Sequence, residues 1–268
     1  MGGQGGEDRW TTGDLYEPYV GRWSRLVARE FLGWLDAPSG LDWLDVGCGT
    51  GALTETIADS GLPKRLVAVD SSPSFLDFAR QRLGSGRPEF READAQDLPF
   101  SAAEFDRVVS GLVLNFVPDQ ARAVTDMARV TRPAGEVALY VWDYAGKMEL
   151  MRYFWDAAAA LDPSAAEMDE GKRFPICQPE ALQNLVEVAG LADVETRVID
   201  VPTVFRNFDD YWSPFLGGQG PAPGYCTSLS EETQASLRER LRAALPTRPD
   251  GSIHLVARAW AVRGRKAS

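Results

Sequence analysis

Between residues 41 and 142 the chain alternates between short apolar runs and segments in which apolar residues recur at helical spacing. A short apolar run is typical of a buried strand, and spacings of three and four residues are typical of a helix packed on one face. The predicted strands are 42–46, 65–69, 89–92, 105–110 and 136–142, and the predicted helices are 52–60, 72–83 and 118–130. This alternation predicts an α/β fold, with a doubly wound parallel sheet covered by helices on both faces.

The flanking segments are less regular. Residues 14–35 carry apolar side chains at helical spacing, although Pro18 is expected to interrupt the first turns. Further predictions are helices over 148–161, 180–189 and 231–245 and strands over 193–205 and 253–262, whereas residues 206–229 carry proline, glycine and aromatic residues together and are assigned no element.

Composition narrows the classes of function. The 268 residues carry a formal net charge of −11, and an acidic surface disfavours general binding to nucleic acid. The single histidine, His254, argues against a histidine-based metal site. Cys48, Cys177 and Cys226 are an odd number at wide spacing, which indicates reduced thiols in a cytoplasmic protein. No apolar run approaches the roughly 20 residues of a membrane-spanning helix.

The first strand runs directly into a turn that holds Gly47, Gly49 and Gly51. Glycines at alternate positions allow a tight turn, expose backbone N–H groups and admit a ligand where a Cβ would collide. Asp45 lies two residues before the first of these glycines. A carboxylate here would repel a nucleotide phosphate, but it would attract a cationic ligand such as S-adenosylmethionine, which carries an ammonium and a sulfonium group.

Five segments, in order along the chain, resemble the motifs of class I S-adenosylmethionine-dependent methyltransferases. The glycine turn resembles the first motif, and Val69-Asp70-Ser71-Ser72-Pro73 resembles the acidic end of the second strand. The other three are Glu92-Ala93-Asp94-Ala95-Gln96-Asp97-Leu98-Pro99-Phe100, Phe105-Asp106-Arg107-Val108-Val109 and Thr131-Arg132-Pro133-Ala134-Gly135-Glu136. The set is most similar to the small-molecule branch that includes the ubiquinone and menaquinone biosynthesis methyltransferases, and it covers roughly residues 40–142.

The resemblance implies a Rossmann-like sheet of seven strands, mostly parallel with the last strand antiparallel, and helical cap insertions. It also implies a division of the chain into five parts. These are a disordered N-terminus (1–13), a helical lid (14–38), a cofactor-binding core (39–143), a region that completes the sheet and carries the substrate cap (144–252), and a final strand with its tail (253–268).

The resemblance also assigns roles to the motifs. Asp45 is expected near the ammonium group of the cofactor, Asp70 at the ribose hydroxyls, and Asp94 with the N–H of Ala95 at the adenine. Each aspartate also has a structural alternative, as a support of the turn, as a helix N-terminal acid, or as a solvated loop residue. The candidate cofactor-binding residues are Tyr19, Arg22, Asp45, Gly47, Cys48, Gly49, Gly51, Asp70, Ser71, Asp94, Ala95, Ser110 and Gly111.

Several other residues have two interpretations. Tyr19 and Arg22 belong either to a lid, in which Arg22 pairs with the carboxylate of the cofactor, or to an ordinary core helix. His254 opens the last predicted strand and is the candidate catalytic base, although most histidines are structural. Asn115 and Phe116 follow the fourth strand and are candidates to face the substrate, and Phe116 fits the core equally well.

The predicted function is transfer of a methyl group from S-adenosylmethionine to a small-molecule acceptor by in-line displacement, with the protein supplying alignment and excluding water. Aromatic residues in the predicted cap favour an apolar or aromatic acceptor, and the sequence sets neither the acceptor atom nor the oligomeric state. One alternative is an NAD(P)-binding oxidoreductase, because Gly47, Gly49 and Ala52 satisfy a loose dinucleotide pattern, although Asp45 opposes a pyrophosphate. Another alternative is a protein that binds S-adenosylmethionine without catalysis.

Overall fold

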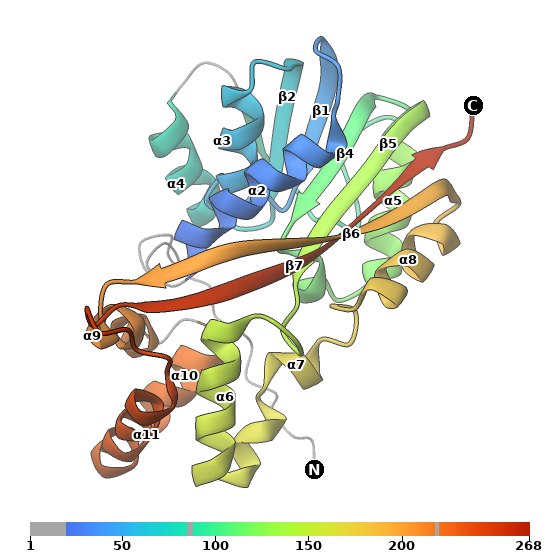
Figure 1. Ribbon diagram of the computed structural model, residues 1–268. Helices are drawn as coiled ribbons and strands as arrows, with labels where there is room; N and C mark the ends of the chain where they lie inside the picture. The colour runs from blue at the N-terminus through green and yellow to red at the C-terminus, as the bar shows by residue number, and fades with distance from the viewer. Residues whose placement is uncertain (1–19, 85–87, 218–219) are drawn as a thin grey trace.

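The structure is a computed structural model that describes residues 20–84, 88–217 and 220–268, and its centre is a seven-stranded sheet (Figure 1). The strands are β1 (Leu41–Val46), β2 (Pro63–Asp70), β3 (Pro88–Glu92), β4 (Phe105–Gly111), β5 (Thr131–Trp142), β6 (Leu191–Phe205) and β7 (Ile253–Lys266). Their order is β3-β2-β1-β4-β5-β7-β6, and β7 runs antiparallel to both its neighbours. The prediction of a mostly parallel Rossmann-like sheet with an antiparallel last strand is confirmed.

Helices cover both faces of the sheet. On one face lie α2 (Arg22–Leu35), α3 (Ala52–Asp59) and α4 (Pro73–Leu83), and on the other lie α5 (Gln120–Val130) and α8 (Pro179–Val188) (Figure 1). The remaining helices are α6 (Glu149–Leu161), α7 (Glu170–Arg173), α9 (Phe208–Trp212), α10 (Pro221–Ser228) and α11 (Glu231–Ala244), with single 3₁₀ turns η2 (Leu114–Phe116), η3 (Pro163–Glu167) and η4 (Ser213–Gly217). We call α6, α7 and α9 to α11 the cap, which Figure 1 shows below the long β6–β7 ribbon.

Local sequence signals explain several of these elements. Ser72 precedes α4 and its hydroxyl accepts a hydrogen bond from the N–H of Phe75, while Pro73 occupies the first helical position, as predicted. Trp43 on β1 is fully buried, and the ring of Phe31 on α2 lies 4.7 Å from that of Tyr140 on β5. The apolar runs therefore form the core between the sheet and its helices.

Strand β5 begins at Thr131 rather than at residue 136. Ala134 has a left-handed φ of 60°, and the register between β4 and β5 shifts between Phe105 and Arg107. Thr131 pairs with Phe105 and Glu136 pairs with Arg107, so residues 132–135, which sequence alone indicates as a turn, form an irregularity in β5 between these two pairs.

The described part of 206–229, to which the sequence assigned no element, folds into α9, η4 and α10. Phe208, Tyr211, Trp212 and Phe215 recur at helical spacing, and this signal predicts the short helices. Their rings pack on one another and on α6, where the ring of Phe154 stacks on that of Phe215 at 4.5 Å. Packing of aromatic rings therefore outweighs the glycines and prolines that indicate a loop.

The predicted helix over 14–35 is described only from its later part, as α2, and residues 1–19 lie outside the described ranges. Of the helices that the structure describes, none is both long and apolar enough to cross a membrane.

We expect Phe154→Ala to lower the free energy of unfolding by about 3–5 kcal/mol, because it removes a fully buried ring and leaves a cavity between α6 and η4. Val188→Ala is the matched control and should change it by less than about 0.5 kcal/mol, since Val188 is 73% exposed. Urea denaturation measures both. A loss below about 1 kcal/mol for Phe154→Ala would contradict this account of the cap.

Candidate active site

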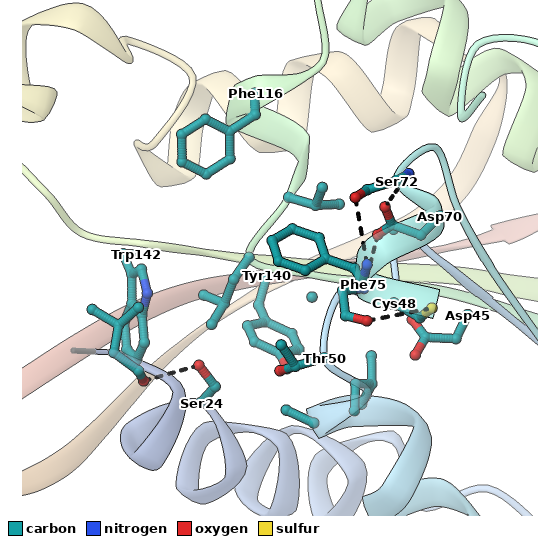
Figure 2. Close-up of a pocket in the computed structure, with 18 of the residues that line it drawn as sticks. Ser24, Asp45, Cys48, Thr50, Asp70, Ser72, Phe75, Phe116, Tyr140 and Trp142 are labelled. Carbon is teal, nitrogen blue, oxygen red and sulfur yellow. Dashed lines mark hydrogen bonds between the residues drawn. The ribbon is translucent and has the colours of Figure 1, made fainter. Parts of the chain in front are cut away.

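A pocket of about 270 Å³ opens at the carboxyl ends of β1, β2, β4 and β5 (Figure 2). The order of strands along the chain reverses its direction between β1 and β4, and ligands of doubly wound sheets bind at such a reversal. The described lining residues are 45, 47–50, 52 and 53 from the glycine loop, 70–72 and 75 after β2, 111–113 and 116 after β4, 140, 142 and 144 from β5 and its continuation, and 20, 24 and 151 from two helices.

Backbone hydrogen bonds hold the glycine loop against β2. The N–H groups of Gly47 and Cys48 donate to the carbonyl of Val69 at 2.8 and 2.9 Å, and the N–H of Gly49 donates to Oδ2 of Asp70 at 2.8 Å. The expectation that these groups face a ligand is therefore wrong. Because the donors are engaged within the protein, and one of them by a carboxylate, the loop is not an anion-binding cradle.

The three glycines have different surroundings. Gly47 has a φ of 73°, and a Cβ on it would lie 2.4 Å from Cγ1 of Val113. A Cβ on Gly51 would approach Leu83 at 3.1 Å. Gly49 has a φ of 52° and lines the pocket, and a Cβ there would meet no atom of the described residues within 4 Å. Gly47 and Gly51 therefore let the loop approach Val113 and helix α4 closely, whereas Gly49 leaves room beside the pocket.

Asp45 is fully buried under this loop and lines the pocket. Its Oδ2 accepts a hydrogen bond from Oγ1 of Thr54 at 2.6 Å, while its Oδ1 has no partner among the described residues. Burial raises the pKa of Asp45 to about 7, and the neighbouring charge of Asp70 acts in the same direction. A buried carboxylate oxygen without a partner is costly, and a cationic group in the pocket would remove that cost. Sequence reasoning missed Thr54, whose contact only the fold reveals.

Asp70 ends β2 and is 7% exposed. Its Oδ1 accepts from the N–H of Ser72 at 2.8 Å, and its Oδ2 receives the hydrogen bond from Gly49. Burial raises its pKa although the two backbone hydrogen bonds oppose that shift. Asp70 therefore fixes the loop and also lines the pocket, as do Ser71 and Cys48, and Figure 2 shows Asp70 close to Ser72 and Cys48.

Of the other residues predicted to contact the cofactor, only some line the pocket. Gly111 lines the pocket, but the hydroxyl of Ser110 donates to the carbonyl of Val46 at 2.8 Å inside the sheet. Asp94 and Ala95 do not line the pocket. The carboxylate of Asp94 accepts hydrogen bonds from the main chain and side chain of Gln96, which lower its pKa. The proposed contact of Asp94 and Ala95 with an adenine stays a prediction.

Arg22 and His254 lie away from the pocket. The guanidinium of Arg22 pairs with Asp210 at 3.2 Å and lies over the rings of Trp23 and Phe205. His254 is exposed on β7, where it pairs with Val204 of β6 beyond the end of β5. The geometry therefore supports neither a contact between Arg22 and a cofactor carboxylate nor a catalytic role for His254. Tyr19 lies outside the described residues.

Of the two candidates after β4, Phe116 lines the pocket and Asn115 does not. Asn115 is buried, with both amide atoms unpartnered among the described residues. The sequence also missed the wall formed by Tyr140, Trp142 and Tyr144, because the apolar run of β5 is typical of a buried central strand. A family model described as a methyltransferase domain matches residues 44–139.

Residues 44–139 therefore belong to a methyltransferase domain family. Among curated relatives, the demethylmenaquinone methyltransferase of Clavibacter sepedonicus is 37% identical over 168 residues, covering 58% of this chain and 66% of that relative. The chain spans about half the length of several other curated relatives that it matches.

Two solved structures share the fold of this chain. A putative methyltransferase from Bacillus halodurans has a TM-score of 0.60 at 17% identity, covering 90% of this chain and 99% of that one. Phosphoethanolamine N-methyltransferase 2 from Haemonchus contortus, solved with phosphomonomethylethanolamine and S-adenosylhomocysteine, has a TM-score of 0.59 at 15% identity, with coverage of 95% and 57%. At these identities the likeness shows the fold alone.

The glycine loop generates a prediction about stability. We expect Gly47→Ala to lower the free energy of unfolding by about 2–4 kcal/mol, because left-handed strain adds to a collision with Val113. Gly49→Ala is the matched variant and should cost only the strain of its left-handed φ, about 1–2 kcal/mol. Chemical denaturation compares the two, and equal losses would contradict the different surroundings described here.

Proposed function

We propose that this methyltransferase binds S-adenosylmethionine in the pocket and transfers its methyl group to a small apolar or aromatic acceptor. The observation that carries the proposal is the buried Oδ1 of Asp45, which lies in the pocket wall without a partner among the described residues. An ammonium group at this place would satisfy that oxygen and stabilise the ionised carboxylate.

The remaining residues fit the other parts of the same ligand. Asp70 has carboxylate lone pairs left after its two backbone hydrogen bonds, and two vicinal hydroxyls of a ribose can donate to them. Gly49 leaves space where a side chain would intrude. We further propose that Asp94 and Ala95, on the loop after β3, meet the adenine beyond the pocket rim.

The pocket also explains how this chain could act without an obvious catalytic pair. When bound, S-adenosylmethionine supplies a methyl group on a positively charged sulfur, which is already activated for transfer. The protein then has to orient the acceptor and keep water out, and Phe116, Trp142 and Met151 form an apolar wall suited to both tasks.

The same geometry disfavours an NAD(P)-binding oxidoreductase. A pyrophosphate needs free backbone donors at the glycine loop, but those of Gly47, Cys48 and Gly49 are engaged, and Asp45 and Asp70 would repel it. Cys48, Cys177 and Cys226 are buried free thiols, and we place the enzyme in the cytoplasm on the ground that such a compartment keeps thiols reduced.

The decisive experiment is calorimetry with S-adenosylmethionine as a function of pH. Because burial raises the pKa of free Asp45 to about 7, a proton must leave before the carboxylate can pair with an ammonium. We therefore expect affinity to be highest near pH 7–8, to fall towards tenfold per pH unit below about pH 6, and to fall again at higher pH, where the ammonium group of the ligand loses its own proton.

Variants of Asp45 test the assignment. Asp45→Asn should flatten this pH dependence and weaken binding at pH 8 by about 1.5–3 kcal/mol, because it removes a charge-assisted hydrogen bond. Glu55→Gln is the control, since Glu55 pairs with Arg25 outside the pocket. Unchanged affinity in Asp45→Asn would overturn the proposal. Binding without release of S-adenosylhomocysteine across a broad acceptor panel would favour a non-catalytic protein.

A further inference from the structure

We propose, building on the proposed function, that the end of the pocket over β5 receives an amine and that the methyl group is transferred to its nitrogen. This end, which we call the aromatic subsite, consists of Phe116, Tyr140, Trp142, Tyr144 and Met151. It contains four aromatic rings and a thioether, and Figure 2 shows Phe116 and Trp142 on the side of the pocket away from Cys48 and Asp45.

The order of the strands separates this subsite from the carboxylates. Asp70 ends β2 and Trp142 ends β5, with β1 and β4 between them. Neighbouring strands lie about 4.8 Å apart, so the two ends of the pocket are about 14 Å apart. A ligand that places its ribose at Asp70 and its ammonium group at Asp45 lies over β2, β1 and β4. The space over β5 is then left for the acceptor.

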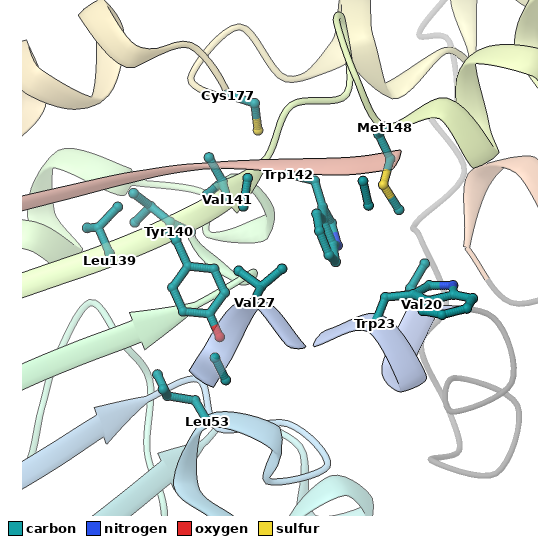
Figure 3. Close-up of a cluster of buried hydrophobic side chains, with 14 of the residues drawn as sticks. Val20, Trp23, Val27, Leu53, Leu139, Tyr140, Val141, Trp142, Met148 and Cys177 are labelled. Atoms are coloured by element: carbon teal, nitrogen blue, oxygen red, sulfur yellow. The ribbon is translucent and has the colours of Figure 1, made fainter. Parts of the chain in front are cut away.

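The rings of the subsite are held in place by buried side chains. Trp142 is 2% exposed, and Figure 3 shows it in a buried cluster together with Val20, Trp23 and Met148. Tyr140 packs on Phe31, and Phe116 and Tyr144 both contact the ring of Phe174. The aromatic wall is therefore preorganised and does not have to form when a ligand arrives.

The charge of the lining selects the chemistry of the acceptor. Among the described residues that line the pocket there are two aspartates and no lysine, arginine or histidine. A phenolate, carboxylate or phosphate would lose its hydration here without gaining a counter-charge. The faces of aromatic rings carry negative potential and attract cations, and of the rings in this lining the indole of Trp142 has the strongest such potential.

Methyl transfer to an amine keeps a positive charge among these rings throughout. The lone pair of the amine nitrogen forms the new N–C bond while the C–S bond breaks, and the sulfur keeps that electron pair as a neutral thioether. The positive charge thereby moves from sulfur to nitrogen. Only a neutral amine has this lone pair, so an acceptor that arrives as an ammonium ion first releases its proton to water. A tertiary amine loses no further proton after the transfer, and a primary or secondary amine releases one more to water. This reaction requires no side-chain base, and the described lining residues include no histidine or lysine that would serve as one.

Equilibrium dialysis with three probes of similar shape tests the subsite without turnover. The probes are benzyltrimethylammonium, its neutral isostere neopentylbenzene, and the anion benzylsulfonate, each measured on the full chain saturated with S-adenosylhomocysteine. We expect the cation to bind about tenfold more tightly than the isostere, and the anion not to bind measurably. A neutral or anionic probe that binds as tightly as the cation would overturn the proposal.

Variants locate the effect in the aromatic subsite. Phe116 is only partly buried, so Phe116→Leu should keep the fold and reduce the preference for the cation about threefold or more. Trp142→Phe keeps a ring at this buried position and should also reduce the preference for the cation. Trp34→Leu is the control, because Trp34 lies outside the pocket, and it should leave the preference unchanged. Equal losses in all three variants would contradict the assignment.

An acceptor panel separates this inference from the function on which it rests. An amine, a phenol and a carboxylic acid on the same benzyl body are offered with S-adenosylmethionine, and the products are identified by mass spectrometry. We expect the amine alone to be methylated. Methylation of the phenol or the acid in its place would overturn the inference and leave the proposed function intact, whereas absence of S-adenosylmethionine binding in calorimetry would overturn the proposed function itself.

Discussion

The pocket is built around a buried carboxylate that the described residues do not fully satisfy. Asp45 lies at the end of β1, beneath a glycine loop whose N–H groups are bonded to β2. Thr54 supplies one hydrogen bond, and the other oxygen has no partner among the described residues. Because hydrogen bonds to β2 hold the loop, its N–H groups do not turn towards this oxygen, and the cost of burying it is what a bound cation would remove in the proposed function.

One end of the pocket carries carboxylates and the other end carries aromatic rings, and the order of the strands sets this arrangement. Asp45 and Asp70 belong to β1 and β2, while Tyr140 and Trp142 belong to β5. A ligand with positive groups can interact favourably with the carboxylates at one end and with the aromatic rings at the other. An anion finds no favourable partner among the described lining residues at either end.

Sequence patterns predicted the features that depend on neighbours along the chain. The strand runs, the cap of α4 at Ser72 and the acid before the glycine loop all arise from local spacing. The aromatic subsite depends on tertiary structure, because Phe116, Trp142 and Met151 come from different elements that the fold brings together. Tyr140 and Trp142 are almost fully buried, so a pattern of burial cannot distinguish their pocket role from an ordinary core role.

The helical period explains why the interpretation of Arg22 as a cofactor ligand is not supported. Val20 and Ser24 are four residues apart and line the pocket from the same side of their helix, so Arg22, midway between them, points away from it. There it pairs with Asp210 and lies against Trp23 and Phe205, which joins α2 to α9 and to the end of β6. Turning Arg22 towards the pocket would break these contacts and leave Asp210 without this partner. Arg22 therefore serves the site indirectly, by fixing the helix whose opposite side forms the pocket wall.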